Sequence, residues 1–421
     1  RTVHTGLLEY KNVYRPARVI SYDKESGELV LHNYMDFDNL KDYVKISYEL
    51  TQDGLLIGKG KLAEVSVVPH SEGKTNLQVN VPENGKCYLK LIYHLKKEMP
   101  LLEEDYILGF DEIEVSQKDA KCQLAEKWVE KTVTDSELQV SEDDTQIHIK
   151  GREFAYTIDR RTALFTEMKF AGREYLNHPM ELNIWRAPTD NDMYIKSEWK
   201  KAHYDKAYTR AYTTEVVQGK HGVKITSHAS VVAETVQKIL DVTITWKIEA
   251  AGKIDADIAV TKDDEFPDLP RFGVRMFLDK KLSAARYFGM GPQESYCDKH
   301  QAASHGLYQA NVDDLHEDYI RPQENGSHYD CEYVELNNSR YGIVVSAENA
   351  FSFNASYYTQ EELEEKTHNY ELTESDSVVF CVDYALNGIG SNSCGPVVLE
   401  QYRFDDVLFR FQFTLIPYIK G

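Results

Sequence analysis

Hydrophobic and polar residues alternate in short runs along most of this chain, a pattern that is typical of antiparallel strands with one buried face. In the first part of the chain, turn signals such as Asp53-Gly54 interrupt the runs. The strands expected here are residues 19–22, 28–33, 43–50, 58–60, 76–81, 87–93 and 113–115. About 100 residues of this kind fit one immunoglobulin-like β-sandwich. We therefore expect such a domain over residues 1–115, opening with a short helix or an extended connector before residue 15.

A second alternating stretch begins near residue 136 and continues to the end of the chain. Residues 116–135 are charged and lack the two-residue period, so we expect a linker or an early strand of the next domain there. One helix is expected at Trp199–Tyr208, where residues recur at spacings of three and four. No second linker interrupts the later stretch, so the pattern predicts one large antiparallel sandwich over residues 136–421. Its clearest expected strands are residues 146–151, 154–159, 163–168, 223–226, 240–248, 254–260 and 271–278.

The charge of the chain limits its partners. The formal net charge of the 421 residues is −21 at pH 7, which disfavours binding to the phosphate backbone of a nucleic acid. No long apolar run and no basic leader segment are present, so neither a transmembrane helix nor a signal peptide is expected in this sequence. The first residues do not resemble a natural start, and we expect the sequence to be a piece of a longer protein.

Six widely separated cysteines contain no Cys-x-x-Cys pair. In a chain of this length they are expected to be reduced thiols of a cytosolic protein, with neither a disulfide framework nor a zinc site. The sequence also lacks a His-Glu-x-x-His motif and a Gly-x-Ser-x-Gly motif. It therefore gives no support to a metal centre or a serine hydrolase.

The most informative run is Asn183-Ile184-Trp185-Arg186-Ala187-Pro188-Thr189-Asp190-Asn191-Asp192. The run begins with apolar, strand-like residues. Pro188 ends the strand, because it has no N–H to donate to a neighbouring strand, and polar residues follow at positions 190–192. This composition predicts a polar loop at the end of a buried strand, a common place for binding residues. Arg186 is close enough in sequence to pair with Asp190 or Asp192. The same residues are also compatible with a solvated Asx-rich turn.

Three further loops carry polar side chains. Glu294 follows a glycine-rich turn after a strand, and it is either an acid or ligand or a cap for the next turn. The run Arg321-Pro322-Gln323-Glu324-Asn325-Gly326 either binds hydroxyl groups or holds two loops together. The run Gly388–Pro396 has small side chains that suit close approach of a ligand and equally suit a surface connector.

Taken in order, these four loops resemble the C-terminal region of the β-galactosidases of glycoside hydrolase family 2. The motifs are Trp-Arg-Ala-Pro-Thr-Asp-Asn-Asp, Gly-Met-Gly-Pro-Gln-Glu, Arg-Pro-Gln-Glu-Asn-Gly and Gly-Ile-Gly-Ser-Asn-Ser-Cys-Gly-Pro. The resemblance covers essentially the whole chain. It implies an all-β protein, with an immunoglobulin-like β-sandwich followed by a large antiparallel β-supersandwich that is similar to galactose mutarotase.

The resemblance also implies roles for particular residues. In the family, the loop after Arg186 moves when sugar binds, and the loop near Cys394 presents a tryptophan to the sugar in some members. This chain has no tryptophan there, which leaves the role of Cys394 open. The expected substrate-rim residues are Arg186, Asp190, Asn191, Asp192, Asn392, Ser393 and Cys394. The expected structural polar residues are Glu294, Arg321, Glu324 and Asn325.

A retaining glycosidase needs two carboxyl groups about 5–5.5 Å apart, and in this family a separate barrel supplies both as glutamates. The resemblance thus implies that this chain alone does not hydrolyse glycosides. It implies that the barrel of the same polypeptide is the partner, that a β-galactoside is the substrate and that the full-length cytoplasmic enzyme is a homo-oligomer. Magnesium and sodium are expected mainly in the barrel, and no catalytic or metal-binding residue is assigned here.

Two other functions remain open at this point. The chain could be a carbohydrate-binding module that acts alone, which requires the polar loops to converge on one sugar pocket. It could instead be a mutarotase-like epimerase, which needs a histidine base and a glutamate acid facing one pocket. His305, His316 and Glu324 are the candidates, although no sequence spacing recommends them.

Overall fold

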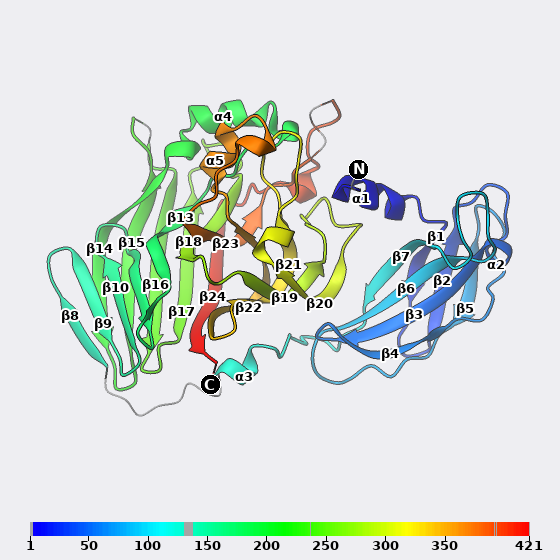
Figure 1. Ribbon diagram of the computed structural model, residues 1–421, viewed down its shortest axis with the longest axis horizontal. Coiled ribbons are helices and arrows are strands. Elements are labelled where there is room, and N and C mark those ends of the chain that lie inside the picture. The colour runs from blue at the N-terminus through cyan, green and yellow to red at the C-terminus, as the bar shows by residue number, and fades with distance from the viewer. Residues whose placement is uncertain (1–2, 130–137, 236, 391, 393, 421) are drawn as a thin grey trace. The chain divides into compact units, whose positions relative to one another are not determined.

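The computed structural model describes residues 3–129, 138–235, 237–390, 392 and 394–420, and it consists of two compact units (Figure 1). The first unit contains Arg1–Leu124 together with two later segments, Met290–Gln293 and His300–Tyr308. The second unit contains the remainder of the chain from Ala125. Strands dominate both units, which confirms the expected all-β class.

The first unit is a sandwich of two antiparallel sheets. One sheet has the order β1-β2-β5 and the other β4-β3-β6-β7. Every second residue of β6 faces the other sheet. The side chains of Leu89, Leu91 and Tyr93 are therefore buried, and they share one core with Leu29 and Leu31 of β2. The elements are α1 (Thr5–Val13), β1 (Ala17–Tyr22), β2 (Glu28–Asn33), α2 (Leu40–Tyr43), β3 (Val44–Gln52), β4 (Leu55–Lys61), β5 (Glu72–Asn76), β6 (Cys87–Leu95) and β7 (Ile107–Glu114).

The second unit begins with the short helix α3 (Glu126–Val129) and contains two sheets. The smaller sheet has the order β12-β11-β10-β9-β8. Its strands are β8 (Gln139–Glu142), β9 (Gln146–Lys150), β10 (Phe154–Asp159), β11 (Leu164–Phe170) and β12 (Arg173–Glu174).

The larger sheet has the central order β13-β18-β23-β22-β24-β17-β16-β15-β14, and β21 pairs with both β19 and β22. These strands are β13 (Leu176–Asn183), β14 (Tyr208–Gln218), β15 (Gly222–Val232), β16 (Leu240–Glu249), β17 (Ile254–Lys262), β18 (Arg271–Asp279), β19 (Ala284–Gly291), β20 (Ser304–Asn311), β21 (Ser327–Asn337), β22 (Tyr341–Ser356), β23 (Ser377–Leu386) and β24 (Leu408–Ile419). Helices α4 (Ile195–Lys201) and α5 (Gln360–Glu365) lie in its connections.

A fully buried tryptophan joins the two sheets of the second unit. Trp246, on β16, donates its indole N–H to the backbone carbonyl of Ala163 at 2.9 Å. Its ring packs edge-on against Phe165 of the smaller sheet at 4.9 Å and against Phe413 of β24 at 6.4 Å. The polar end of the indole is satisfied and its apolar body is enclosed, as a buried tryptophan requires.

Two expected elements differ from the structure. The helix expected at Trp199–Tyr208 is wrong in its placement, because α4 ends at Lys201 and His203 adopts a left-handed backbone with a φ of 57°. The strand expected at 76–81 is also wrong, because β5 ends at Asn76. Beyond that point the N–H of Leu77 leaves the ladder and donates to the carbonyl of Gly27. In both cases the spacing of the apolar residues reflects their packing against other segments. The backbone does not follow the helical or strand period that this spacing predicts.

Close packing around β18 gives a stability test. A Cβ added at Gly273 would lie 2.2 Å from the carbonyl oxygen of Val382 and 2.5 Å from a carboxylate oxygen of Asp383. We expect Gly273→Ala to lower the free energy of unfolding by about 1–3 kcal/mol, because the neighbouring strand must shift. Urea denaturation followed by circular dichroism measures this. Gly219→Ala is the control, since its nearest neighbour would be 3.5 Å away. Equal stability of the two variants would contradict the packing argument.

Candidate functional site

The loop that follows β13 is built around a buried ion pair. Arg186 is fully buried, and its guanidinium donates to both carboxylate oxygens of Asp192, from Nη2 at 2.7 Å and from Nε at 3.2 Å. It also donates to the backbone carbonyls of Asn387, at 2.5 Å, and Gly388, at 3.2 Å. Of the two partners that the sequence left open, Asp192 forms the pair.

Asp192 also fixes the backbone of this loop. Its Oδ2 accepts hydrogen bonds from the N–H of Thr189 at 2.8 Å and from the Thr189 hydroxyl at 3.1 Å, within a capping box. Burial opposes the charge of Arg186, but the charge and hydrogen bonds of Asp192 outweigh it and raise the pKa of Arg186. The pair is therefore a charged brace inside the protein.

The loop containing Gln323 and Glu324 meets the loop containing Asp190. Gln323 accepts a hydrogen bond from the backbone N–H of Asp190 at 3.0 Å and donates to its carboxylate at 3.2 Å. The backbone N–H of Glu324 donates to the carbonyl of Ala187 at 3.0 Å. These contacts connect two loops that lie more than a hundred residues apart in sequence.

The glycine-rich loop at Gly388–Pro396 is the third loop that these contacts join. Asp298 accepts hydrogen bonds from the backbone N–H groups of Ile389, at 3.0 Å, and Gly390, at 2.7 Å. The side chain of Asn191 donates to the carbonyl of Gly390. The expected rim residues Asp190 and Asn191 thus each bind a different neighbouring loop through hydrogen bonds.

The tip of the glycine-rich loop carries the remaining expected rim residues. Asn392 is half-buried and Cys394 is exposed, while Ser393 lies outside the described residues. All six cysteines are free thiols in the structure.

A second buried ion pair lies beside the loop of Glu324. Arg271, at the start of β18, donates to Asp383 of β23 from Nη2 at 2.5 Å and from Nε at 3.1 Å. Its Nη1 donates to both oxygens of Glu324 at 3.3 Å. Burial raises the pKa of Glu324, and the charges of Arg271 and Arg186 offset part of that effect.

Sequence reasoning missed Arg271 and Asp383, which both lie within strands. The available signal was one charged residue inside an otherwise apolar run, at Arg271-Phe272 and at Val382-Asp383. Their pairing partner could not be identified, because 112 positions separate them.

Glu294 ties together a third set of segments. It accepts hydrogen bonds from the ammonium of Lys299 at 2.6 Å, from the backbone N–H of Gly326 at 2.8 Å and from the hydroxyl of Tyr319. Burial opposes its charge, but Lys299, the Tyr319 hydroxyl and the Gly326 N–H outweigh burial and lower the pKa of Glu294. Glu294 is a buried carboxylate that holds the 319–326 loop.

The other expected structural residues of that loop divide into two kinds. Asn325 is buried, accepts from the N–H of Glu317 at 3.0 Å and donates to the carbonyl of Gln323 at 2.9 Å. Arg321 is exposed. A cavity of about 260 Å³ lies here, and its lining includes Thr189, Asp190 and Arg321.

The histidines proposed for epimerase chemistry are differently placed. His305 belongs to the first unit, where its Nδ1 lies 2.7 Å from a carboxylate oxygen of Glu112. His316 and Glu324 belong to the second unit, and Glu324 is engaged by Arg271. Burial lowers the pKa of His316.

Over the described residues, no group of three or more His, Cys, Asp or Glu side chains is placed to hold a metal ion. No helix among the described residues is long and apolar enough to cross a membrane.

Removing the charge of Asp192 tests the buried brace. We expect Asp192→Asn to lower the free energy of unfolding by about 3 kcal/mol, because Arg186 keeps a buried charge without its counter-ion. Urea denaturation measures the change. Asp190→Asn, at an exposed position of the same loop, is expected to cost less than about 1 kcal/mol. Similar losses in the two variants would argue against the brace.

The pKa of Glu294 gives a pH-dependent prediction. A carboxyl group whose pKa is lowered by folding contributes stability above its unfolded pKa, about 4.3, and loses that contribution as the pH falls through the folded pKa. Glu294→Gln should therefore be less stable than the parent at pH 7. The difference should shrink as the pH falls below about 4. Denaturation of both proteins across this range measures it, and a difference that is independent of pH would contradict the assignment.

Comparisons with known proteins bear on the whole chain. A family model described as beta galactosidase small chain matches residues 150–415, and one described as beta-galactosidase, domain 4, matches residues 29–116. A β-galactosidase of Actinobacillus pleuropneumoniae is 42% identical over 99% of this chain and 40% of its own length. A β-galactosidase of Staphylococcus xylosus is 30% identical over 99% of this chain and 41% of its own length. The chain thus spans about two fifths of these curated relatives.

Among solved structures, a galactose 1-epimerase from Lactobacillus acidophilus NCFM covers 69% of this chain and 100% of its own, with 10% identity and a TM-score of 0.38. The match to the small-chain family model spans more than half of the sequence. The chain therefore belongs to the beta galactosidase small chain family.

Proposed function

We propose that this chain is the non-catalytic C-terminal part of a retaining β-galactosidase, and that it completes the rim of the sugar site and supplies assembly surface. The observation that carries this proposal is the match to relatives named β-galactosidase, in which this chain corresponds to only 40% of the length. The remaining part would contribute the barrel and both catalytic glutamates, which act as acid/base and nucleophile.

The state of the buried carboxylates supports the absence of hydrolysis by the chain alone. A retaining pair needs one carboxyl group free to give up a proton and one free to attack carbon. Asp192 and Asp383 are each held by an arginine, and Glu294 is held by Lys299. Breaking any of these pairs would leave an unpaired buried charge. These groups suit the positioning of loops better than proton transfer.

The convergence of three loops supports the rim role. The loops of Asp190, Gln323 and Gly390 are joined by side-chain hydrogen bonds, and two of them line the cavity of about 260 Å³. Loops supported by a rigid sheet are the usual place for binding residues. In this proposal Asp190, Asn191 and the tip at Asn392 face the galactoside, while Arg186 and Asp192 brace the loop from beneath.

The proposal also covers the metal ions, the oligomeric state and the cellular location of the complete enzyme. We assign the magnesium and sodium ions of the resembling family to the part outside this chain, and a homo-oligomer and a cytoplasmic location to the complete protein. Six free thiols are compatible with a reducing compartment.

Activity measurements test the proposal directly. The purified chain is expected to hydrolyse o-nitrophenyl β-D-galactopyranoside no faster than a protein-free blank. Adding the separately produced remainder of the polypeptide is expected to restore turnover, because both catalytic glutamates then enter the complex. The release of nitrophenol, followed by absorbance, measures both.

The remainder of the polypeptide without this chain is the necessary control, and it is expected to be less active than the mixture. Turnover that co-purifies with this chain through several columns, at a constant specific activity, would overturn the proposal.

A further inference from the structure

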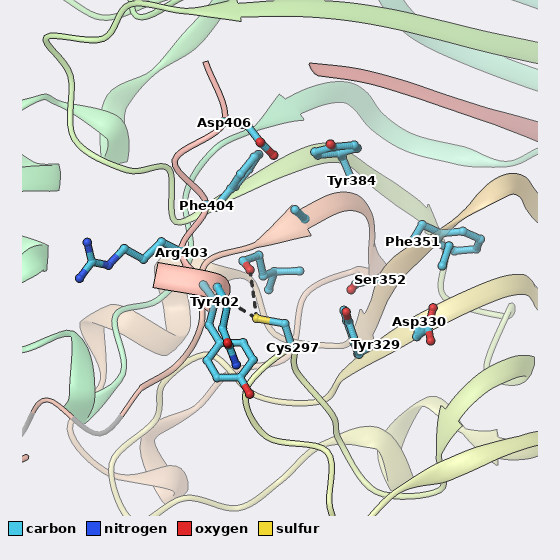
Figure 2. Close-up of a pocket in the computed structure, with 14 residues that line it drawn as sticks. Cys297, Tyr329, Asp330, Phe351, Ser352, Tyr384, Tyr402, Arg403, Phe404 and Asp406 are labelled. Atoms are coloured by element: carbon cyan, nitrogen blue, oxygen red, sulfur yellow. Dashed lines mark hydrogen bonds between the residues drawn. The ribbon is translucent and has the colours of Figure 1, made fainter. Parts of the chain in front are cut away.

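A second cavity in the second unit is lined by residues that make none of the loop contacts described above. It has a volume of about 310 Å³ and opens between the interior of β22, the end of β23 and the segment 401–406 that precedes β24 (Figure 2). Figure 2 shows Tyr384, Phe404 and Asp406 on one side and Tyr329, Asp330 and Ser352 on another. None of these six side chains has been given a role so far.

Aromatic rings form much of the wall of this cavity. The ring of Tyr384 stacks on Phe409 at 4.9 Å with an interplanar angle of 16° and lies 5.8 Å from Phe404. These contacts hold the ring in one orientation, so little conformational entropy is lost when a ligand covers it. An immobilised aromatic ring offers a flat apolar face with a polar edge. A pyranose ring has a complementary surface, with C–H groups on one face and hydroxyls around its rim.

Polar groups lie around these rings. Asp330, Ser352, Gln401 and Asp406 provide carboxylate, hydroxyl and amide atoms, which include both donors and acceptors. Sites for small polar ligands commonly combine apolar walls with a few such groups, because the polar groups set orientation. Burial and the neighbouring Asp405 raise the pKa of Asp406, and a hydrogen bond with the Tyr384 hydroxyl offsets part of that effect.

The charge of the cavity selects among small ligands. Its charged lining residues are Asp330, Asp406 and Arg403, so carboxylates outnumber cations. The Nε of Arg403 donates to the carbonyl of Val398 at 3.0 Å, and Figure 2 shows its guanidinium directed away from both carboxylates. Anions are therefore disfavoured. Metal ions are disfavoured as well, since no three ligating side chains gather in the described part of the chain.

The backbone conformation at Asp330 favours an aspartate or asparagine at this position. Asp330 has a φ of 54°, in the left-handed region that few side chains other than Asn and Asp tolerate. It lies in β21 where the pairing with β22 is interrupted between His328 and Cys331. A bulge of this kind commonly redirects a side chain. Here the carboxylate lines the cavity.

We propose that this cavity is a binding site for a neutral pyranose sugar, with Tyr384 against the ring and Asp330, Ser352 and Asp406 bonded to its hydroxyls. The site is made wholly from the second unit, so the inference does not rest on the proposed function. A chain that is catalytically inactive can bind sugar here, and a chain that is active can fail to do so.

Saturation-transfer NMR and calorimetry on the chain test this site, with methyl β-D-galactopyranoside and methyl β-D-glucopyranoside as probes. We expect at least one pyranoside to bind. Asp406→Asn should weaken that binding about tenfold, the equivalent of one hydrogen bond to a charged group. Asp330→Asn is a second variant with a similar expected effect, and it retains a residue type that tolerates the left-handed backbone.

The matched control is Asp144→Asn, which makes the same chemical change at an exposed turn of the same unit and should leave the dissociation constant unchanged. Equal thermal midpoints for all variants would show that folding is intact. Absence of saturation transfer to both pyranosides would overturn the proposal. Binding that neither cavity variant weakens, or binding of inorganic phosphate in preference to sugar, would overturn it as well.

Discussion

Buried ionic bonds between segments distant in sequence are the constraint on which the loop region of the second unit depends. Three cations, on Arg186, Arg271 and Lys299, lie among four buried carboxyl groups. The carboxyl groups belong to Asp192, Asp383, Glu324 and Glu294. The electrostatic influence of Arg186 reaches Glu324, and that of Glu294 reaches Glu324 as well, so the pairs form one network. Four carboxyl groups face three cations, and burial raises the pKa of both Glu324 and Asp383.

Such a network fixes the relative positions of the loops more than it increases the free energy of unfolding. Burying charges costs solvation free energy that the ion pairs only partly return, and apolar residues of similar volume often stabilise a protein as well. An ion pair nevertheless accepts few alternative geometries, because each arginine needs planar, paired acceptors. The loops of Asp190, Gln323 and Gly390 therefore have one mutual arrangement. This is the property that a sugar site assembled from separate loops requires.

Much of the architecture could be predicted from the alternation of apolar and polar residues. The strand expected at 28–33 coincides with β2, and the four ordered motifs led to the family that the comparison confirms. The ionic network was less accessible. Arg186 was recognised because a proline and three polar residues follow it, whereas Arg271 lies in an apolar run and resembles an ordinary strand residue. The cavity at Tyr384 has no motif, because its walls come from separate strands and loops.

The composition of the first unit has a consequence for how the chain folds during synthesis. Late residues complete it, since Glu9 accepts hydrogen bonds from the N–H groups of Gln301 and Ala302, and the ring of His305 stacks on Tyr88 at 4.1 Å. A ribosome must translate past Tyr308 before these partners exist. The β-sandwich is thus synthesised well before the segments that complete its surface, and that surface is exposed to other unfolded chains until they follow.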